Sequence, residues 1–144
     1  MAAGALYTPE ILGLAVALAA RPLTADLRWR GEARSASCGS SLVVGLALDG
    51  EGRIARIGLA AQACAIGQAS AALFADAAAG RDAGEIAAAQ RALEAWLAGE
   101  GGMPDWPGLA AIAPAQGYPA RHGAITLAWR AALAAMAQPP LAAA

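Results

Sequence analysis

The spacing of apolar residues near the start of the chain predicts a helix. Thr8 offers a capping hydroxyl, and Pro9 suits the first position of a helix. The apolar residues that follow recur at helical spacing: Ile11, Leu12, Leu14, Ala15 and Leu18. We expect this helix to end near Arg21 and Pro22, because proline interrupts helical hydrogen bonding.

The pattern then changes to that of β-strands. In residues 26–35, Leu27 and Trp29 alternate with Arg28 and Arg30, which predicts a strand with one buried face. Residues 41–49 are rich in leucine and β-branched side chains and predict a second strand. Residues 49–52 (DGEG) are typical of a hairpin turn, so residues 53–60 form a third strand. The sequence therefore predicts three antiparallel strands after the first helix.

Helical spacing returns after the third strand. It predicts one helix from Cys64 to about Ala79 and another over residues 82–97, which Gly99 ends. A segment rich in turn residues follows, with one short helix expected over residues 107–113. The last helix is expected from Pro119 to about residue 137, where two prolines stop it.

This order of elements predicts the fold class. Strands and helices are segregated along the chain, which favours an α+β fold of two layers. We expect an N-terminal helix, a three-stranded antiparallel sheet, and several helices packed on one face of the sheet. Residues 1–138 would form a single domain and residues 139–144 a flexible tail.

Composition narrows the class of protein. The chain has 144 residues, of which 58% are hydrophobic, enough for one core without disulfide bonds. No stretch reaches the roughly 18 uninterrupted apolar residues of a membrane-spanning helix. The apolar run at residues 11–20 lacks the basic segment that precedes the core of a secretory signal. Two cysteines fit a reducing compartment. We expect a cytoplasmic monomer or weak dimer with no membrane partner.

The charge pattern argues against binding of nucleic acid or nucleotide. The net charge is −1, and the ten arginines are scattered without a lysine. Arg28, Arg30 and Arg34 alternate along a predicted strand, which fits a solvated face better than a phosphate-binding patch. The glycines form no phosphate-binding motif between a strand and a helix.

The two cysteines are the strongest candidates for chemistry. Cys38 lies between the first two predicted strands, and Cys64 lies where the third strand gives way to a helix. In a small meander both connections can lie at one edge of the sheet. Cys64 also lies near a helix N-terminus, whose free N–H groups and dipole stabilise a thiolate. A separation of 26 positions matches no zinc-finger spacing, so two buried structural thiols stay an alternative.

Three stretches carry a family resemblance: residues 37–40 (SCGS), 62–70 (QACAIGQAS) and 118–130 (YPARHGAITLAWR). Together they resemble the U-type iron-sulfur cluster assembly scaffolds, the family of NifU, IscU and SufU. The likeness runs from about Leu6 to Met136, and the long spacer before Pro119 resembles the Gram-positive-type, SufU-like branch. The resemblance implies a protein that accepts sulfur from a cysteine desulfurase and assembles a cluster or relays the persulfide.

The resemblance also implies a degenerate set of metal ligands. Cys38 and Cys64 match the first and second cysteines of the family. Ser40 stands where the family has an aspartate, and its neutral hydroxyl cannot supply the charge of a carboxylate. Ala124 stands where the family has its third cysteine and offers no ligand.

His122 is the only histidine in the chain and lies two residues before Ala124. On a regular helix the two side chains would point roughly 200° apart, so His122 cannot take over the direction of Ala124. Gly123 could make this turn irregular enough for the imidazole to swing inward. His122 is thus either a metal ligand or acid-base neighbour of the cysteines, or an exposed or helix-capping side chain.

Three functional hypotheses follow from these residues. In the first, Cys38, Cys64 and His122, completed by Ser40 or water, hold zinc or a cluster, and Cys38 accepts sulfur. Because only two thiolates remain, stable assembly of a [2Fe-2S] cluster is disfavoured. In the second, the fold binds a desulfurase or partner scaffold without metal. In the third, Cys38 and Cys64 cycle through a disulfide, although the chain lacks a C-x-x-C motif.

Overall fold

Three antiparallel strands form one sheet in the order β1-β2-β3. In the computed structural model, which describes residues 6–36 and 39–142, the strands are β1 (Trp29–Arg34), β2 (Ser41–Leu48) and β3 (Ile54–Gln62). Arg34 pairs with Ser41, and Ser41 pairs with Gln62. The end of β1, the start of β2 and the end of β3 therefore lie at the same end of the sheet.

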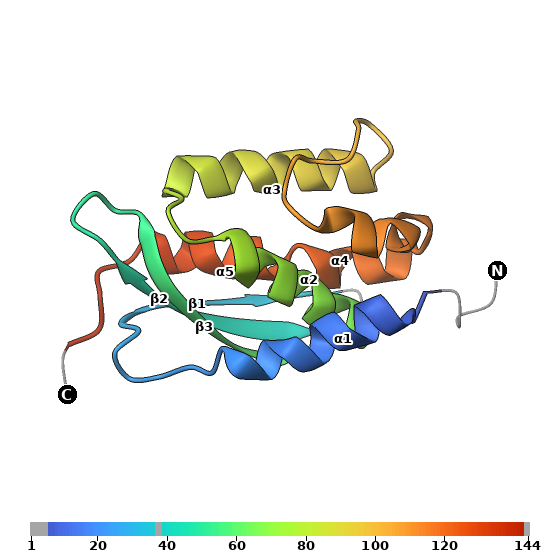
Figure 1. The fold of residues 1–144 in the computed structure, drawn as a ribbon. Coiled ribbons are helices and arrows are strands. Elements are labelled where there is room, and N and C mark those ends of the chain that lie inside the picture. The colour runs from blue at the N-terminus through green and yellow to red at the C-terminus, as the bar shows by residue number, and fades with distance from the viewer. Residues whose placement is uncertain (1–5, 37–38, 143–144) are drawn as a thin grey trace.

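The helices pack on one face of this sheet, as the sequence predicts (Figure 1). The N-terminal helix α1 (Pro9–Ala17) continues into the short 3-10 helix η2 (Leu18–Ala20). The long helices α2 (Ala65–Ala77) and α3 (Ala83–Leu97) follow β3. Asp82 begins α3 with a capping box, in which it exchanges hydrogen bonds with Glu85. The α+β fold class is confirmed.

The last third of the chain is less regular than its periodicity predicts. In place of a short helix over residues 107–113, the chain forms the 3-10 helix η3 (Leu109–Gly117), which contains Pro114. In place of one continuous last helix, it forms η4 (Pro119–Arg121), α4 (His122–Ile125) and α5 (Leu127–Met136). Prolines lack the N–H that an α-helix needs, so this segment begins with 3-10 turns.

Close packing of α5 on β1 depends on a residue without a side chain. The helix-facing side of the sheet buries Leu42, Val44 and Leu46 of β2. On β1 the same side carries Gly31, where an added Cβ would lie 2.1 Å from the backbone oxygen of Ala131 in α5. The backbone of α5 therefore lies directly against β1, which fixes the height of α5 above the sheet.

The connection between η2 and β1 crosses the opposite face of the sheet. Gly45 of β2 and Gly58 of β3 are register partners. A Cβ on Gly58 would lie 2.2 Å from the backbone oxygen of Pro22 and 2.7 Å from a methyl carbon of Leu27. The helices therefore cover one face, and part of the other face is covered by residues 22–27.

An aromatic cluster joins the helices above the sheet. Phe74 of α2 lies 5.4 Å from the ring of Trp106 and 5.1 Å from the ring of Trp129 in α5. The Trp106 ring N–H donates to the carbonyl of Leu73 at 2.9 Å, and the Arg81 guanidinium lies over the Trp106 ring. Trp96, Trp106 and Trp129 are buried.

The segment after the last helix contacts the start of the sheet. Leu141 exchanges two hydrogen bonds with Arg28, one of them between their backbones at 2.8 Å. The flexibility of residues 139–144 stays a prediction.

In the described part of the chain, every helix is too short or too polar to cross a bilayer.

Candidate functional site

Cys64 is the N-cap residue of α2, as the sequence predicts. Its backbone is extended, with φ −65° and ψ 169°, while its carbonyl accepts the first helical hydrogen bond, from the Gln68 N–H at 3.0 Å. Its side chain makes no capping hydrogen bond and is half-buried against the core. The thiol is therefore partly accessible at the positive end of a 13-residue helix.

Cys38 lies outside the described residues, but the ends of its loop are defined. The Ser35 N–H donates to the Ser40 carbonyl at 2.8 Å, and the Gly39 N–H donates to the Ser35 carbonyl at 3.0 Å. Gly39 has φ +70°, a conformation that favours glycine. This loop joins β1 to β2 at the end of the sheet where β3 hands over to Cys64. The shared edge is confirmed, whereas the distance between the thiols is not described.

Ser40, the third sequence candidate, is buried beside the first residue of β2, with 6% of its surface exposed. Its backbone carbonyl closes the loop with Ser35. Its hydroxyl also lacks the negative charge of a carboxylate, so a metal would gain little from it. A role for Ser40 as a ligand stays a prediction.

Ala124, the position that the resemblance gives to a third cysteine, faces the first turn of α2. Ala124 is 1% exposed, and a Cβ built on Gly67 would lie 3.1 Å from the Ala124 Cβ. The Ser70 hydroxyl donates to the Ile125 carbonyl at 2.7 Å, which ties α4 to α2. Position 124 therefore lies against the turn that Cys64 begins, and its methyl group offers no metal ligand.

His122 makes a specific hydrogen bond. Its Nε2 lies 2.8 Å from the backbone oxygen of Gln116 in η3. Since a carbonyl oxygen only accepts, this contact assigns the proton to Nε2. In the neutral ring, Nδ1 then carries the lone pair. A histidine that binds metal commonly donates its other N–H to a backbone carbonyl, so the contact suits a ligand that binds through Nδ1.

Ser40, just before β2, and Cys64, just after β3, lie at one end of the sheet, and Ala124 lies against the first turn of α2, but the described residues gather no complete metal site there. Among residues 6–36 and 39–142, no three His, Cys, Asp or Glu side chains are grouped closely enough to hold a metal ion. His122 lines a hollow between α3 and α5, and Ala124 faces α2. The two side chains therefore point to different parts of the structure, as expected from their spacing on a helix. The complete Cys38, Cys64, His122 and Ser40 set stays a prediction.

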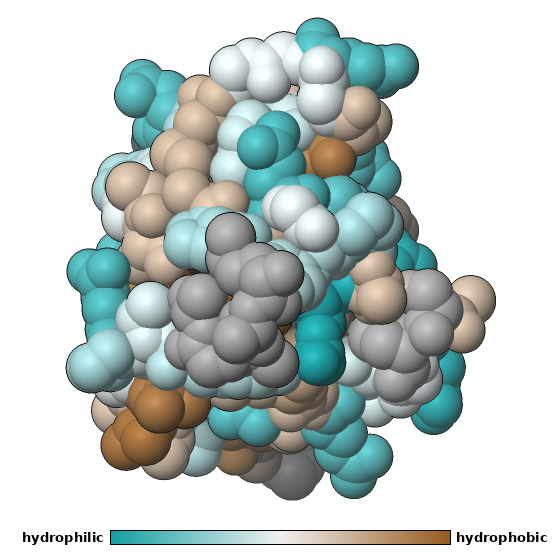
Figure 2. All heavy atoms as spheres, turned by 90° about the vertical axis from the view of Figure 1, so that its right-hand side faces the viewer, coloured by the Kyte–Doolittle hydropathy of each residue, from teal (hydrophilic) through white to brown (hydrophobic). Residues whose placement is uncertain are grey.

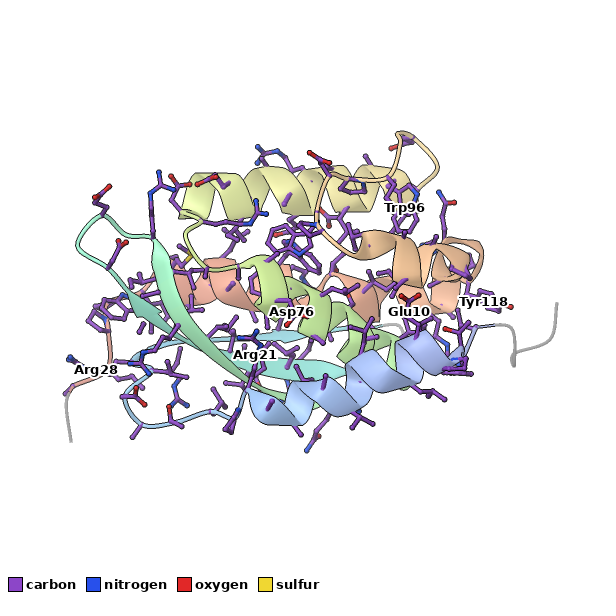
Figure 3. The ribbon with its side chains drawn as sticks, viewed as in Figure 1. Glu10, Arg21, Arg28, Asp76, Trp96 and Tyr118 are labelled. Carbon is purple, nitrogen blue, oxygen red and sulfur yellow. The ribbon has the colours of Figure 1, made fainter. Side chains whose placement is uncertain are left out.

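Two further contacts shape this region, and sequence patterns gave no signal for them. The Arg130 guanidinium donates through Nη2 to the Arg34 carbonyl at 3.1 Å, which ties α5 to the base of the Cys38 loop. The Gln116 side chain donates to the Trp96 carbonyl at 2.6 Å. Trp96 lies in the last turn of α3 (Figure 3). Side-chain contacts to distant backbone carbonyls leave no periodic trace in a sequence.

The surface around this end is mixed in character. Figure 2 views the molecule from the right-hand side of Figure 1, where β1 ends and α2 begins. Hydrophilic and weakly hydrophobic residues alternate over most of the visible surface.

The titratable groups with shifted pKa values in the described chain, Asp26, Asp49 and Arg53, lie in other segments. Their ion pairs and turn hydrogen bonds belong to the fold outside this end of the sheet.

Comparison with known proteins adds evidence at the level of structure. No protein-family model matches the sequence, and no curated protein matches it. Among solved structures, a nitrogen-fixing NifU-like protein (N-terminal) from Brucella abortus is similar, with a TM-score of 0.78 and 27% identity over 89% of this chain and 90% of that chain. A proposed iron-sulfur cluster assembly scaffold protein for the SUF system from Fervidobacterium islandicum has a TM-score of 0.73 and 18% identity, over 93% and 99% of the two chains. At 18% identity, the likeness to this second structure shows a shared fold alone.

Proposed function

Because this chain shares its structure with the U-type iron-sulfur cluster assembly scaffolds, as its sequence resemblance predicts, we propose that it handles sulfur during cluster assembly. It would take sulfur from a cysteine desulfurase and relay it or hold a nascent cluster. The observation that carries the proposal is the position of Cys64 at the N-terminus of α2, at the same end of the sheet as the Cys38 loop. The same proposal places the protein in the cytoplasm and in the SufU-like branch of the family.

The chemistry assigned to Cys38 is nucleophilic. Its thiolate attacks the outer sulfur of a persulfide on the desulfurase. The sulfur–sulfur bond of that persulfide breaks, a new one forms on Cys38, and the cysteine thiolate of the desulfurase leaves. The resemblance gives this step to Cys38, whose covalent neighbour Gly39 is exposed in the loop. Cys64 would hold the metal, since the dipole of α2 stabilises its thiolate form.

The donor set favours zinc or a transient cluster over a stable [2Fe-2S] cluster. Cys38 and Cys64 supply two thiolates. In this proposal the His122 ring, which lines the hollow between α3 and α5, turns toward α2 so that its Nδ1 atom supplies the third donor. Three protein ligands leave one position of a tetrahedral zinc site open for an incoming sulfur atom. A stable cluster commonly needs four thiolates, and Ala124 and Ser40 supply none. A cluster on this protein is therefore cargo that is passed on.

Metal content and sulfur transfer test this function together. We expect protein purified without chelator to hold about one zinc or iron per chain, and Cys38→Ser and Cys64→Ser to lose it. His122→Ala should weaken zinc at least tenfold, while Gln138→Ala, at an exposed position, should not. After incubation with a desulfurase and free cysteine, mass spectrometry should find an added sulfur on Cys38. A wild-type chain that acquires neither metal nor sulfur would refute the proposal.

Restoring the missing thiol gives a gain-of-function test. Ala124 lies against the turn that Cys64 begins, so Ala124→Cys places a third thiol beside that turn. We expect this variant to retain iron or zinc more tightly than wild type, because thiolates are the preferred ligands. Ala120→Cys is the matched control, since it adds a thiol to an exposed position of the neighbouring η4 turn. Equal metal retention by both variants would show that position 124 is not part of the site.

The loss of two family ligands motivates a second candidate function. The chain would keep the fold to bind a desulfurase or a partner scaffold without handling metal. Ala124 and Ser40 are both buried and uncharged, so they contribute to packing. Desulfurase binding should then survive in the triple variant Cys38→Ser, Cys64→Ser, His122→Ala. Loss of binding in that variant would exclude this alternative.

A further inference from the structure

A hollow of about 350 Å³ opens between the end of α3 and the α4–α5 segment. Glu94 and Leu97 of α3 form one wall, and His122, Thr126 and Arg130 form the other. Its volume is at the lower end of the range for small-molecule sites. The hollow therefore has room for a small metabolite rather than for a nucleotide or a peptide.

Opposite charges face this hollow without neutralising one another. Arg130 and Glu94 both line it, yet they form no ion pair with each other in the described structure. Arg130 uses Nη2 to hold the Arg34 carbonyl, which leaves most of its five N–H donors for other partners. Glu94 accepts a hydrogen bond from the Gln90 side chain at 3.5 Å, which is long for such a contact. A positive and a negative group are thus both available to a ligand.

Between the charged residues, the two walls are apolar and hydroxylic. Leu97 and Thr126 are both buried, and Thr126 is 6% exposed. The His122 ring is held in place by its hydrogen bond to Gln116, so it forms a fixed side of the hollow. A ligand here meets one cation, one anion and a small apolar surface, with Arg130 braced on β1 through Arg34.

We propose that this hollow binds a free α-amino acid with a small apolar side chain. Its carboxylate contacts the Arg130 guanidinium, its ammonium contacts the Glu94 carboxylate, and its side chain lies on Leu97. An inorganic anion fits less well, because Glu94 would repel it. An internal residue of a peptide fits less well too, because it carries neither of the two charges.

Binding is best measured on a metal-free chain in which both cysteines are replaced by serine. That background separates this inference from the proposed function, since neither metal nor sulfur can be held by a thiol. L-alanine and L-valine are titrated while two-dimensional NMR follows the backbone amides of Gly123 and Ala98, which also line the hollow. We expect saturable shifts at these amides.

Charge-deleted probes and variants define the expected result. N-acetyl-L-alanine lacks the ammonium and L-alaninamide lacks the carboxylate, so both should bind at least tenfold more weakly than L-alanine. Glu94→Gln and Arg130→Lys should each weaken L-alanine at least tenfold, because Lys lacks the planar fork of Arg. Arg91→Gln, which removes an exposed charge from α3 outside the hollow, should change nothing.

Three outcomes would overturn the inference. One is the absence of saturable shifts at Gly123 and Ala98 with any amino acid. Another is equal binding of L-alanine, its amide and its N-acetyl derivative, which would mean that the two charges are not read. The last is binding of inorganic phosphate that is stronger than that of L-alanine and increases in Glu94→Gln, which would assign the hollow to anions.

Discussion

Replacing Gly31 with alanine tests how closely the helical layer lies on the sheet. A Cβ at this position would lie 2.1 Å from the Ala131 backbone oxygen and 2.5 Å from the Ala135 backbone nitrogen. Ordinary contacts of this kind lie near 3.5 Å, so α5 would have to move away from β1 by about 1.4 Å. Both obstacles are backbone atoms of one helix, so no side chain can rotate out of the way.

The expected cost follows from this geometry. Overpacking of a core costs about 1 to 3 kcal/mol, and a clash with backbone belongs at the upper end of that range. Alanine recovers about 0.5 kcal/mol because it loses less conformational entropy than glycine on folding. We therefore expect Gly31→Ala to lower the free energy of unfolding by about 2 kcal/mol and the melting temperature by roughly 6 °C.

The measurement needs a control that separates packing from glycine entropy. Gly13 lies in α1, and a Cβ there would have no atom within 4 Å. Gly13→Ala should therefore raise the free energy of unfolding by about 0.5 to 1 kcal/mol. Urea unfolding, followed by the fluorescence of the buried Trp106 and Trp129, reports both values. If Gly31→Ala is as stable as wild type to within about 0.5 kcal/mol, the close approach of α5 to β1 is wrong.

Two further predictions concern local structure outside the site. Asp82→Ala removes the side chain that accepts the Glu85 N–H at 2.9 Å, so thermal unfolding should show a loss of about 1 kcal/mol; an unchanged melting temperature would contradict the capping role. The N–H groups of Arg53 and Glu51, both 2.9 Å from one Asp49 oxygen, lower the pKa of Asp49 below 3.8. Its contribution to stability is therefore complete above pH 3.8 and is lost as the pH falls through the folded pKa, so the stability gap between wild type and Asp49→Asn should close below about pH 4. A gap that stays constant from pH 7 to pH 3 would refute this assignment.

Much of the fold could be read from local patterns. The alternation around Trp29, the DGEG turn at residues 49–52 and the helical spacing after Cys64 each depend on neighbouring residues, and each element forms where it was expected. The placement of Cys64 at a helix N-terminus followed from the same reading. The likeness to U-type scaffolds was also present in short motifs around the two cysteines and the last helix.

The ligand set was only partly readable in the same way. The resemblance to U-type scaffolds implies that Ser40 and Ala124 stand at two ligand positions of that family, and the sequence shows that neither residue carries a charged or thiol ligand. It left the role of His122 open, because the direction of an imidazole depends on whether its helix is regular. The structure gives this side chain a partner 2.8 Å away, the Gln116 carbonyl, which lies in a 3-10 helix that extends beyond the short helix expected over residues 107–113.

The sequence by itself determined which residues form strands and helices and where the two thiols lie along the chain, because those features depend on contacts between near neighbours. Tertiary structure alone decided the close packing of α5 against Gly31 and the hollow that Glu94 and Arg130 line. These features arise between segments far apart in the chain. Their physical cause is the packing of one backbone against another, which no local pattern encodes.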